Sequence, residues 1–168
     1  KPTLPDTYHS ALKNQLDALI EKNGNPGNDL LPQVSELAEL FADPAVDGAL
    51  TSLLGPDYIL HPHRHCHDWN PDSQAQAWHK DYPITGHPRC HRGRWLLLLY
   101  YPQTITQHMG PTAIQPRTQH YMDATPDAPG LELCVEAGTV VIAHYDIWHK
   151  ATANTSDQTR YMLKFLFG

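Results

Sequence analysis

Trp78-His79-Lys80-Asp81 is the stretch around which the chain is organised, and it lies within residues 74–82, which we predict to form a β-strand. Side chains two residues apart on a strand point to the same face. His79 and Asp81 therefore lie close enough to share one metal ion. Trp78 points to the opposite face, where we expect it to pack in the core. Because this short spacing also occurs by chance, a third ligand from elsewhere in the chain is needed to make it specific.

A second pair of residues, His149 and Arg160, flanks the turn-forming residues 154–157, Asn-Thr-Ser-Asp. A hairpin folded about the first two of these places His149 directly opposite Arg160 on one face. Together with His79 and Asp81, His149 then completes a set of two imidazoles and one carboxylate. This set is the facial triad of non-haem iron(II) sites. Arg160 is placed to hold the far carboxylate of a dicarboxylate bound to the same ion, through two parallel N–H bonds.

The motifs read, in chain order, Gln76-x-x-His79-x-Asp81, Gly110-Pro111-Thr112-x-x-x-Pro116-x-x-x-His120, Gly138-Thr139-Val140-Val141-Ile142-x-x-x-x-x-Trp148-His149, and Asn154 with Arg160. Over about residues 37–167 this combination resembles the phytanoyl-CoA dioxygenase family, which comprises Fe(II)/2-oxoglutarate oxygenases on a double-stranded β-helix. The resemblance implies His79, Asp81 and His149 as iron ligands. It implies Arg160 as the partner of the 2-oxoglutarate C5 carboxylate, with Gln76 and Thr112 as further contacts of this cosubstrate. The family's Pro-Gly-Ser-His turn differs here, where it reads Pro116-Arg117-Thr118-Gln119-His120.

The reaction implied by the resemblance is a 2-oxoglutarate-dependent dioxygenation. Such an enzyme uses Fe(II), 2-oxoglutarate and O2 to hydroxylate or otherwise oxidise a small molecule, and it releases succinate and CO2. Asp81 favours oxidation over halogenation, because halogenating relatives have a small residue there that leaves room for chloride. Two alternatives remain, a cupin-type metal-dependent dioxygenase or isomerase without 2-oxoglutarate, and a non-catalytic metal-binding jelly-roll protein. Arg160 separates them from the first interpretation, because a site without the dicarboxylate has no use for it.

The expected fold is α+β and mainly β, with N-terminal helices over residues 1–55 packed outside a jelly-roll core over residues 56–168. Asp43, Pro44 and Gly55 have the cap, first-position and closing roles of one helix. The predicted helices cover residues 6–22, 33–41 and 43–55, with a loop at 23–32. The predicted strands begin at residue 58 and include residues 74–82, 94–101, 112–114, 131–135, 139–144, 148–151 and 160–167; residues 84–92 and 124–130 are predicted loops.

Four of the twelve histidines alternate along one predicted strand, at His61, His63, His65 and His67. They share one face, but the row is too extended to close on one ion, so we expect one or two of them to line the substrate pocket. Pro62 favours an edge strand. Elsewhere, His144 is a competing ligand candidate and His120 is expected to support a turn or the pocket wall.

Composition narrows the class of protein. The chain has 168 residues and a net charge of −6, which suits one domain over residues 1–168. It has no basic run for nucleic acid and no apolar run near the roughly 20 residues of a membrane span. Three cysteines without a C-x-x-C spacing argue against a disulfide framework and favour a cytoplasmic location. We expect a small-molecule substrate and a monomer or homodimer; the absence of an initial Met is consistent with N-terminal trimming.

Overall fold

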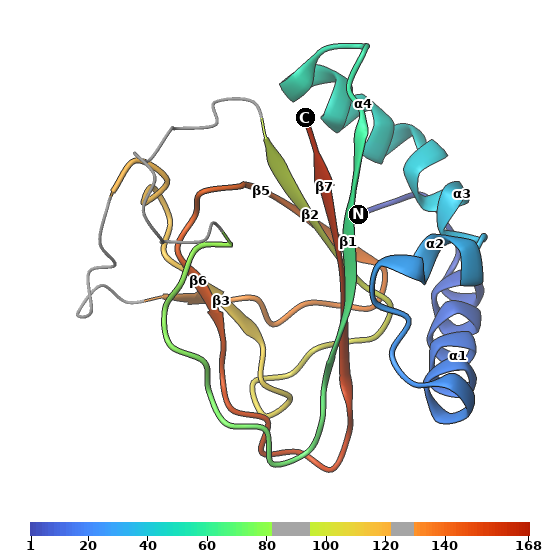
Figure 1. Cartoon of the computed structure of the whole chain (residues 1–168), viewed down its shortest axis with the longest axis vertical. Helices are drawn as coiled ribbons and strands as arrows, with labels where there is room; N and C mark the ends of the chain where they lie inside the picture. The colour runs from blue at the N-terminus through green and yellow to red at the C-terminus, as the bar shows by residue number, and fades with distance from the viewer. Residues whose placement is uncertain (82–94, 122–129) are drawn as a thin grey trace.

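Two antiparallel β-sheets form the body of the protein, and the computed structural model describes residues 1–81, 95–121 and 130–168. The larger sheet has the order β1 (Leu60–Trp69), β7 (Arg160–Phe167), β2 (Leu96–Tyr101), β5 (Thr139–His144). The smaller sheet has the order β4 (Leu131–Glu132), β3 (Thr112–Ile114), β6 (His149–Ala151). Helices cover one face of the larger sheet and the smaller sheet lies on its other side (Figure 1). The predicted mixed, mainly β class is confirmed.

The helices come first in the chain, as predicted. They are α1 (Asp6–Asn23), α2 (Leu30–Gln33), α3 (Leu37–Ala42) and α4 (Pro44–Leu54), with a 3-10 turn η1 (Gly27–Asp29). Asp43 caps α4 by accepting a hydrogen bond from Ala45 N at 2.9 Å, and Pro44 is the first helical residue, as expected. The predicted loop at residues 23–32 is wrong in part, because η1 and most of α2 lie there. Pro32 is tolerated because it lies in the first turn of α2, where its missing N–H is not needed.

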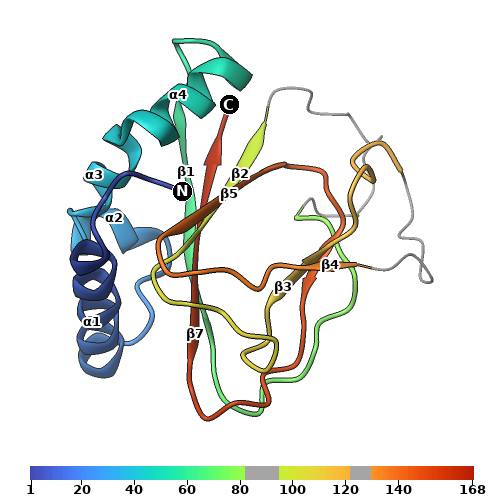
Figure 2. The same cartoon turned by 180° about the vertical axis from the view of Figure 1, so that it is seen from behind.

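Strand β7 joins the two layers of the protein, and all its residues are buried. Its side chains alternate between the sheet's two faces. Tyr161, Leu163, Phe165 and Phe167 pack in the core beneath the helices, together with Leu12, Leu16, Leu40 and Leu50. Arg160, Met162 and Lys164 point to the other side, toward the smaller sheet, where all three line a pocket. Figure 2 shows from behind how the smaller sheet faces this side of β7. One strand therefore serves both the core and the pocket.

Strand β1 is an edge strand, as Pro62 predicted, and its pairing with β7 is irregular between Leu60 and Arg64. The segment before α2 covers this edge. Asn28 accepts a hydrogen bond from Arg64 N through its side chain, at 3.1 Å, and from Arg64 Nε through its carbonyl, at 3.0 Å. Asn25 Nδ2 donates to Cys66 O at 2.7 Å. Two side chains of the N-terminal part thus take up backbone groups that an edge strand leaves free.

The predicted hairpin between His149 and Arg160 is wrong, because β6 pairs with β3 in the smaller sheet and β7 lies in the larger one. The turn-forming residues instead make a crossing between the sheets. Asn154 stabilises this crossing, since its side-chain amide donates to Trp69 O and Gln158 O, both at 2.8 Å. These contacts hold residues 154–158 in the crossing between the sheets, so they do not form the turn of a β-hairpin.

Two other predicted strands are shorter than expected. Residues 74–81 form no regular strand and contact β6 through the isolated bridge His79–His149 and a hydrogen bond from Gln76 N to Ala151 O at 2.9 Å. In the predicted strand 131–135, only Leu131–Glu132 belongs to one. The predicted loop at 84–92, most of that at 124–130, and Cys90 lie outside the described residues. None of the described helices has the length and apolar character that a membrane-spanning helix requires.

Gly138 precedes β5 in a left-handed conformation, with φ of 79°, and a Cβ there would collide with the buried ring of His9. We expect Gly138→Ala to lower the free energy of unfolding by more than about 2 kcal/mol, since the backbone strain alone costs about 1–2 kcal/mol. Gly48, within α4, is the matched control, because nothing lies within 4 Å of the position of its added Cβ. Gly48→Ala should raise stability by about 0.5–1 kcal/mol. Urea unfolding of both variants measures the difference, and equal effects would refute this role of Gly138.

Candidate functional site

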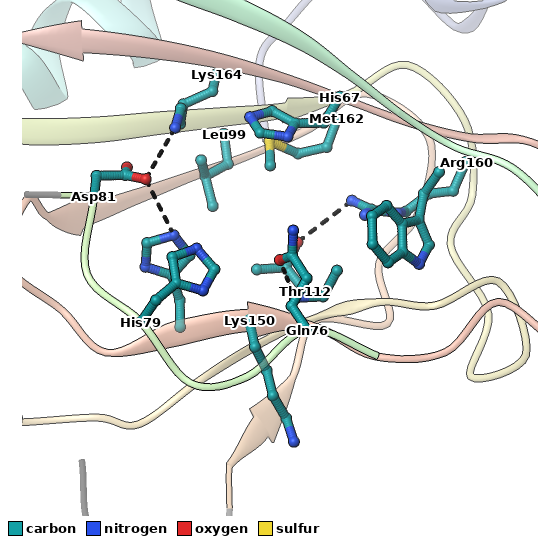
Figure 3. Close-up of a pocket in the computed structure, with 13 residues that line it drawn as sticks. His67, Gln76, His79, Asp81, Leu99, Thr112, Lys150, Arg160, Met162 and Lys164 are labelled. Carbon is teal, nitrogen blue, oxygen red and sulfur yellow. Dashed lines mark hydrogen bonds and ion pairs between the residues drawn. The ribbon is translucent and has the colours of Figure 1, made fainter. Parts of the chain in front are cut away.

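Three predicted ligand residues, His79, Asp81 and His149, lie together between the two sheets (Figure 3). One ligand atom from each lies within 4.8 Å of the others, and no other such group of three occurs among residues 1–81, 95–121 and 130–168. The backbone bridge aligns the two histidines, with His79 N donating to His149 O at 3.0 Å and His149 N to His79 O at 2.9 Å. This single pair replaces the full strand that the sequence predicted.

The two imidazoles are oriented by the backbone next to them. His79 Nδ1 lies 3.0 Å from Ala77 O, and His149 Nδ1 lies 3.0 Å from Ile147 O. A carbonyl only accepts, so each Nδ1 carries the proton and each Nε2 has a free lone pair. Metal-binding histidines commonly make this second bond, because it fixes the tautomer and the ring orientation. Both rings are thus oriented with Nε2 turned to the site as a possible metal ligand.

Asp81 is the acidic member of the site. Its Oδ1 lies 3.1 Å from Lys164 Nζ and 3.6 Å from His149 Nε2, while its buried Oδ2 has no hydrogen-bond partner in the described structure. Burial alone would raise the pKa of Asp81, but the nearby His149 and the positive charge of Lys164 outweigh it and hold the pKa well below its ordinary value. Burial lowers the pKa of His79. A charged carboxylate and a neutral imidazole are the protonation states that a divalent cation needs.

The chemistry of these donors fits one divalent metal ion. Two imidazole nitrogens and a carboxylate oxygen favour iron or a similar first-row metal over Ca²⁺ or Mg²⁺, which prefer oxygen ligands. The Oδ2 atom of Asp81, which has no hydrogen-bond partner among the described residues, is a second oxygen that could bind the ion. The three residues can therefore hold a metal on one side and leave its other side free.

A pocket extends from these residues toward Arg160, with about 430 Å³ not filled by protein atoms, part of it open to solvent. Both sheets and the segment of residues 74–81 contribute to its lining. The lining comprises His67, Trp69, Gln76, His79, Asp81, Leu99, Thr112, His149, Lys150, Ala151, Arg160, Met162 and Lys164.

Arg160 lies in this pocket although the predicted hairpin does not form, because it is the first inward-facing residue of β7. It is only 1% exposed. Its Nη1 donates to Thr112 Oγ1 at 3.5 Å, its guanidinium lies 6.0 Å from the ring of Trp69, and its Nε has no partner in the described part of the chain. Burial lowers the pKa of Arg160. A buried guanidinium without a carboxylate partner is a ready site for an anion.

Gln76 and Thr112 both line the pocket, as the sequence predicted. Gln76 Oε1 accepts a hydrogen bond from Ala151 N at 3.0 Å, so its amide N–H groups remain for a ligand. Thr112 is 2% exposed and holds its hydroxyl beside Arg160. The turn that differs from the family pattern also supports the site. Arg117 takes the left-handed φ of 68° there, and Thr118 Oγ1 accepts from Trp148 N at 3.2 Å, next to His149.

The histidine row divides as expected, with one member in the pocket. His67 lines it, and burial together with nearby positive charge lowers its pKa to about 3. His61 packs against Trp95, with ring centroids 5.0 Å apart, and His63 is exposed. His144 is not part of the ligand group, since its Nδ1 accepts a hydrogen bond from Asp146 N at 3.0 Å.

Lys164 is the pocket residue that sequence reasoning missed. The available signal was its position four residues after Arg160, which places both side chains on the same face of a strand. Trp78 and Trp148 both lie outside the pocket lining, but Trp78 is only half-buried and does not belong to the core, where it was expected. Trp148 is buried, and Trp78 has the ammonium of Lys150 over its ring at 4.7 Å.

Several solved enzymes share this fold. SnoK and SnoN, a non-heme alpha ketoglutarate dependent carbocyclase and epimerase from nogalamycin biosynthesis, give TM-scores of 0.77 and 0.79 at 21% and 15% identity. Each match covers 98% of this chain, and 76% of SnoK and 74% of SnoN. HygX from Streptomyces hygroscopicus, solved with iron bound, gives 0.71 at 12% identity, over 98% of this chain and 78% of its own.

No curated protein shows a significant sequence match to the chain. The family model described as phytanoyl-CoA dioxygenase (PhyH) matches residues 9–162. This span includes the His-Asp-His group, Thr112 and Arg160. The chain therefore belongs to the phytanoyl-CoA dioxygenase family.

Proposed function

We propose that this protein is an Fe(II)/2-oxoglutarate-dependent dioxygenase that hydroxylates a small molecule, with its two sheets forming a double-stranded β-helix. The observation that carries the proposal is the pairing of two features in one pocket. One is a His-Asp-His group suited to a divalent ion, and the other is the buried guanidinium of Arg160, which has no carboxylate partner among the described residues. A metal-bound dicarboxylate connects the two.

The residues of the chain have distinct roles in this proposal. His79, Asp81 and His149 would hold Fe(II) on one side, and the ion's other side would be left for 2-oxoglutarate and O2. Arg160 binds the C5 carboxylate through parallel N–H bonds, assisted by the Thr112 hydroxyl. When bound, the iron and cosubstrate supply the oxidising chemistry, in which 2-oxoglutarate becomes succinate and CO2. The protein orients the reactants and limits water.

Two features favour this function over the alternatives. A cupin-type enzyme without 2-oxoglutarate has no anion for Arg160 and leaves a buried charge unpaired, which is costly. The carboxylate of Asp81 occupies the ligand position where a halogenating enzyme needs space for chloride. Hydroxylation is therefore favoured over halogen transfer. Succinate formation with Fe(II), 2-oxoglutarate and O2, measured against a panel of small metabolites, tests the proposal directly.

A substitution that removes the charge of Asp81 but keeps the shape of its side chain should strongly weaken metal binding. We expect Asp81→Asn to weaken Co(II) binding by more than about 100-fold, since losing even an outer-shell partner of a metal ligand costs about 10–100-fold. Anaerobic titration of the Co(II) absorbance measures the affinity. Asp57→Asn is the control, because Asp57 is exposed and lies outside the pocket lining. Unchanged Co(II) affinity in Asp81→Asn would refute the assignment of this ligand.

Removing the guanidinium of Arg160 should affect the cosubstrate and spare the metal. We expect Arg160→Met to weaken 2-oxoglutarate binding by at least about 100-fold, because two charge-assisted hydrogen bonds at about 1.5–3 kcal/mol each are lost. The visible charge-transfer absorbance of the anaerobic Fe(II)/2-oxoglutarate complex measures this affinity. Arg160→Lys, which keeps the charge without the fork, should show an intermediate loss. A parallel Co(II) titration should change less than about 3-fold; equal losses of metal and cosubstrate would contradict the role of Arg160.

A further inference from the structure

Lys164 is a second buried cation in the pocket, and neither the metal site nor the cosubstrate site uses it. The residue is 8% exposed. Its Nζ lies 3.1 Å from Asp81 Oδ1 and makes no other hydrogen bond or ion pair within the described residues. Figure 3 shows Lys164 reaching toward Asp81 from the larger sheet, at the end of the pocket away from Arg160. An ammonium has three N–H donors, so two of them are free to bind another acceptor.

The charges that line the pocket leave Lys164 without a counter-charge once the proposed ligands bind. Asp81 is the one carboxylate among the lining residues that the structure describes. The two positive charges of Fe(II) are balanced by Asp81 and by the C1 carboxylate of 2-oxoglutarate. The C5 carboxylate balances Arg160. Lys150 does not enter this count, because its ammonium lies over the Trp78 ring and points away from the pocket (Figure 3).

A lysine at this place works against the metal. Its positive charge shares the Asp81 carboxylate with the ion and repels the ion. Burying an ammonium beside a divalent cation is costly unless an anion compensates it. On β1 the residue opposite Lys164 is His65, with His67 next along the pocket wall, and neither can supply a negative charge. Among the described residues no further carboxylate lines the pocket, which leaves a bound molecule as the source of the anion.

We propose that Lys164 is a substrate-binding residue, and that the substrate is a small molecule with an anionic group, a carboxylate or a phosphate, held at Lys164 Nζ beside the metal. This inference rests on the proposed function, because the charge count assumes bound Fe(II) and 2-oxoglutarate. It narrows the substrate class from small molecules in general to acids. A carbon atom close to the anionic group is then the one nearest the open side of the metal.

The test uses the whole chain loaded with Mn(II) and 2-oxoglutarate without O2, so that no turnover is needed. Compounds are offered in matched sets with one carbon skeleton, as a carboxylate, a phosphate monoester and a neutral primary amide. Broadening of their proton NMR lines by Mn(II) reports binding near the metal, and Zn(II)-loaded protein is the diamagnetic blank. We expect the wild type to bind an anionic member at least about 10-fold more tightly than its amide, since a charge-assisted hydrogen bond contributes about 1.5–3 kcal/mol. The carboxylate and phosphate arms distinguish the two anions.

Three variants assign this preference to Lys164. Lys164→Met should lose it, and Lys164→Arg should retain part of it, which also guards against a folding defect. Lys150→Met is the matched control, because it removes the same charge from a lining residue whose ammonium points away, and its preference should equal that of the wild type. Lys164→Met should bind Mn(II) at least as tightly as the wild type and 2-oxoglutarate within about 3-fold, since a repulsive charge is removed.

Four results would overturn the inference. These are equal binding of amides and acids by the wild type, no binding of any compound, an anion preference that persists in Lys164→Met, and a large loss of Mn(II) or 2-oxoglutarate affinity in that variant. The last would make Lys164 a support for Asp81 or for the cosubstrate. Succinate assays separate this inference from the proposed function. An anion preference that depends on Lys164, without succinate formation by the wild type, would support the subsite and refute the oxygenase.

Discussion

The reciprocal pair of backbone hydrogen bonds between His79 and His149 is the interaction on which the site depends. His79 lies in a segment without a regular strand, His149 begins the short strand β6, and the two segments are far apart in the sequence. Two hydrogen bonds fix the distance between their Cα atoms, and the local Nδ1 contacts then fix the rings. A short bridge is enough because β6 is already held by β3 and because the Gln76 backbone and side chain both bond to Ala151.

Strand β7 supplies the opposite wall and gives the pocket its rigidity. One set of its side chains is locked in the core under the helices, so the alternate set, with Arg160 and Lys164, has little freedom to move. Functional groups on a buried central strand are positioned more reliably than groups on loops. The same arrangement places the buried cations Arg160 and Lys164 at opposite ends of one pocket. Asp81 is the single acidic residue among the described lining residues.

The sequence predicted the site residues better than the path that brings them together. Spacing of two residues placed His79 beside Asp81, and the family resemblance supplied Arg160. The expected hairpin failed because turn-forming residues show that the chain changes direction but not which sheet it enters next. Lys164 was missed for a related reason. The role of a lysine within an apolar strand depends on its neighbour across the pocket. For Lys164 this neighbour is Asp81, which comes from a distant segment of the chain. The helix ends were predicted where a cap or proline marked them, as at Asp43 and Pro44.

The covered edge of β1 has a consequence for any attempt to divide the chain. Asn25 and Asn28 occupy backbone groups of this strand, and both belong to the N-terminal part. A fragment that begins at residue 56 would keep every proposed ligand but would expose a bare strand edge and the apolar face beneath α1. Such edges recruit other strands and promote aggregation. The helical part therefore protects this edge, and we expect the part that carries the proposed ligands to depend on it.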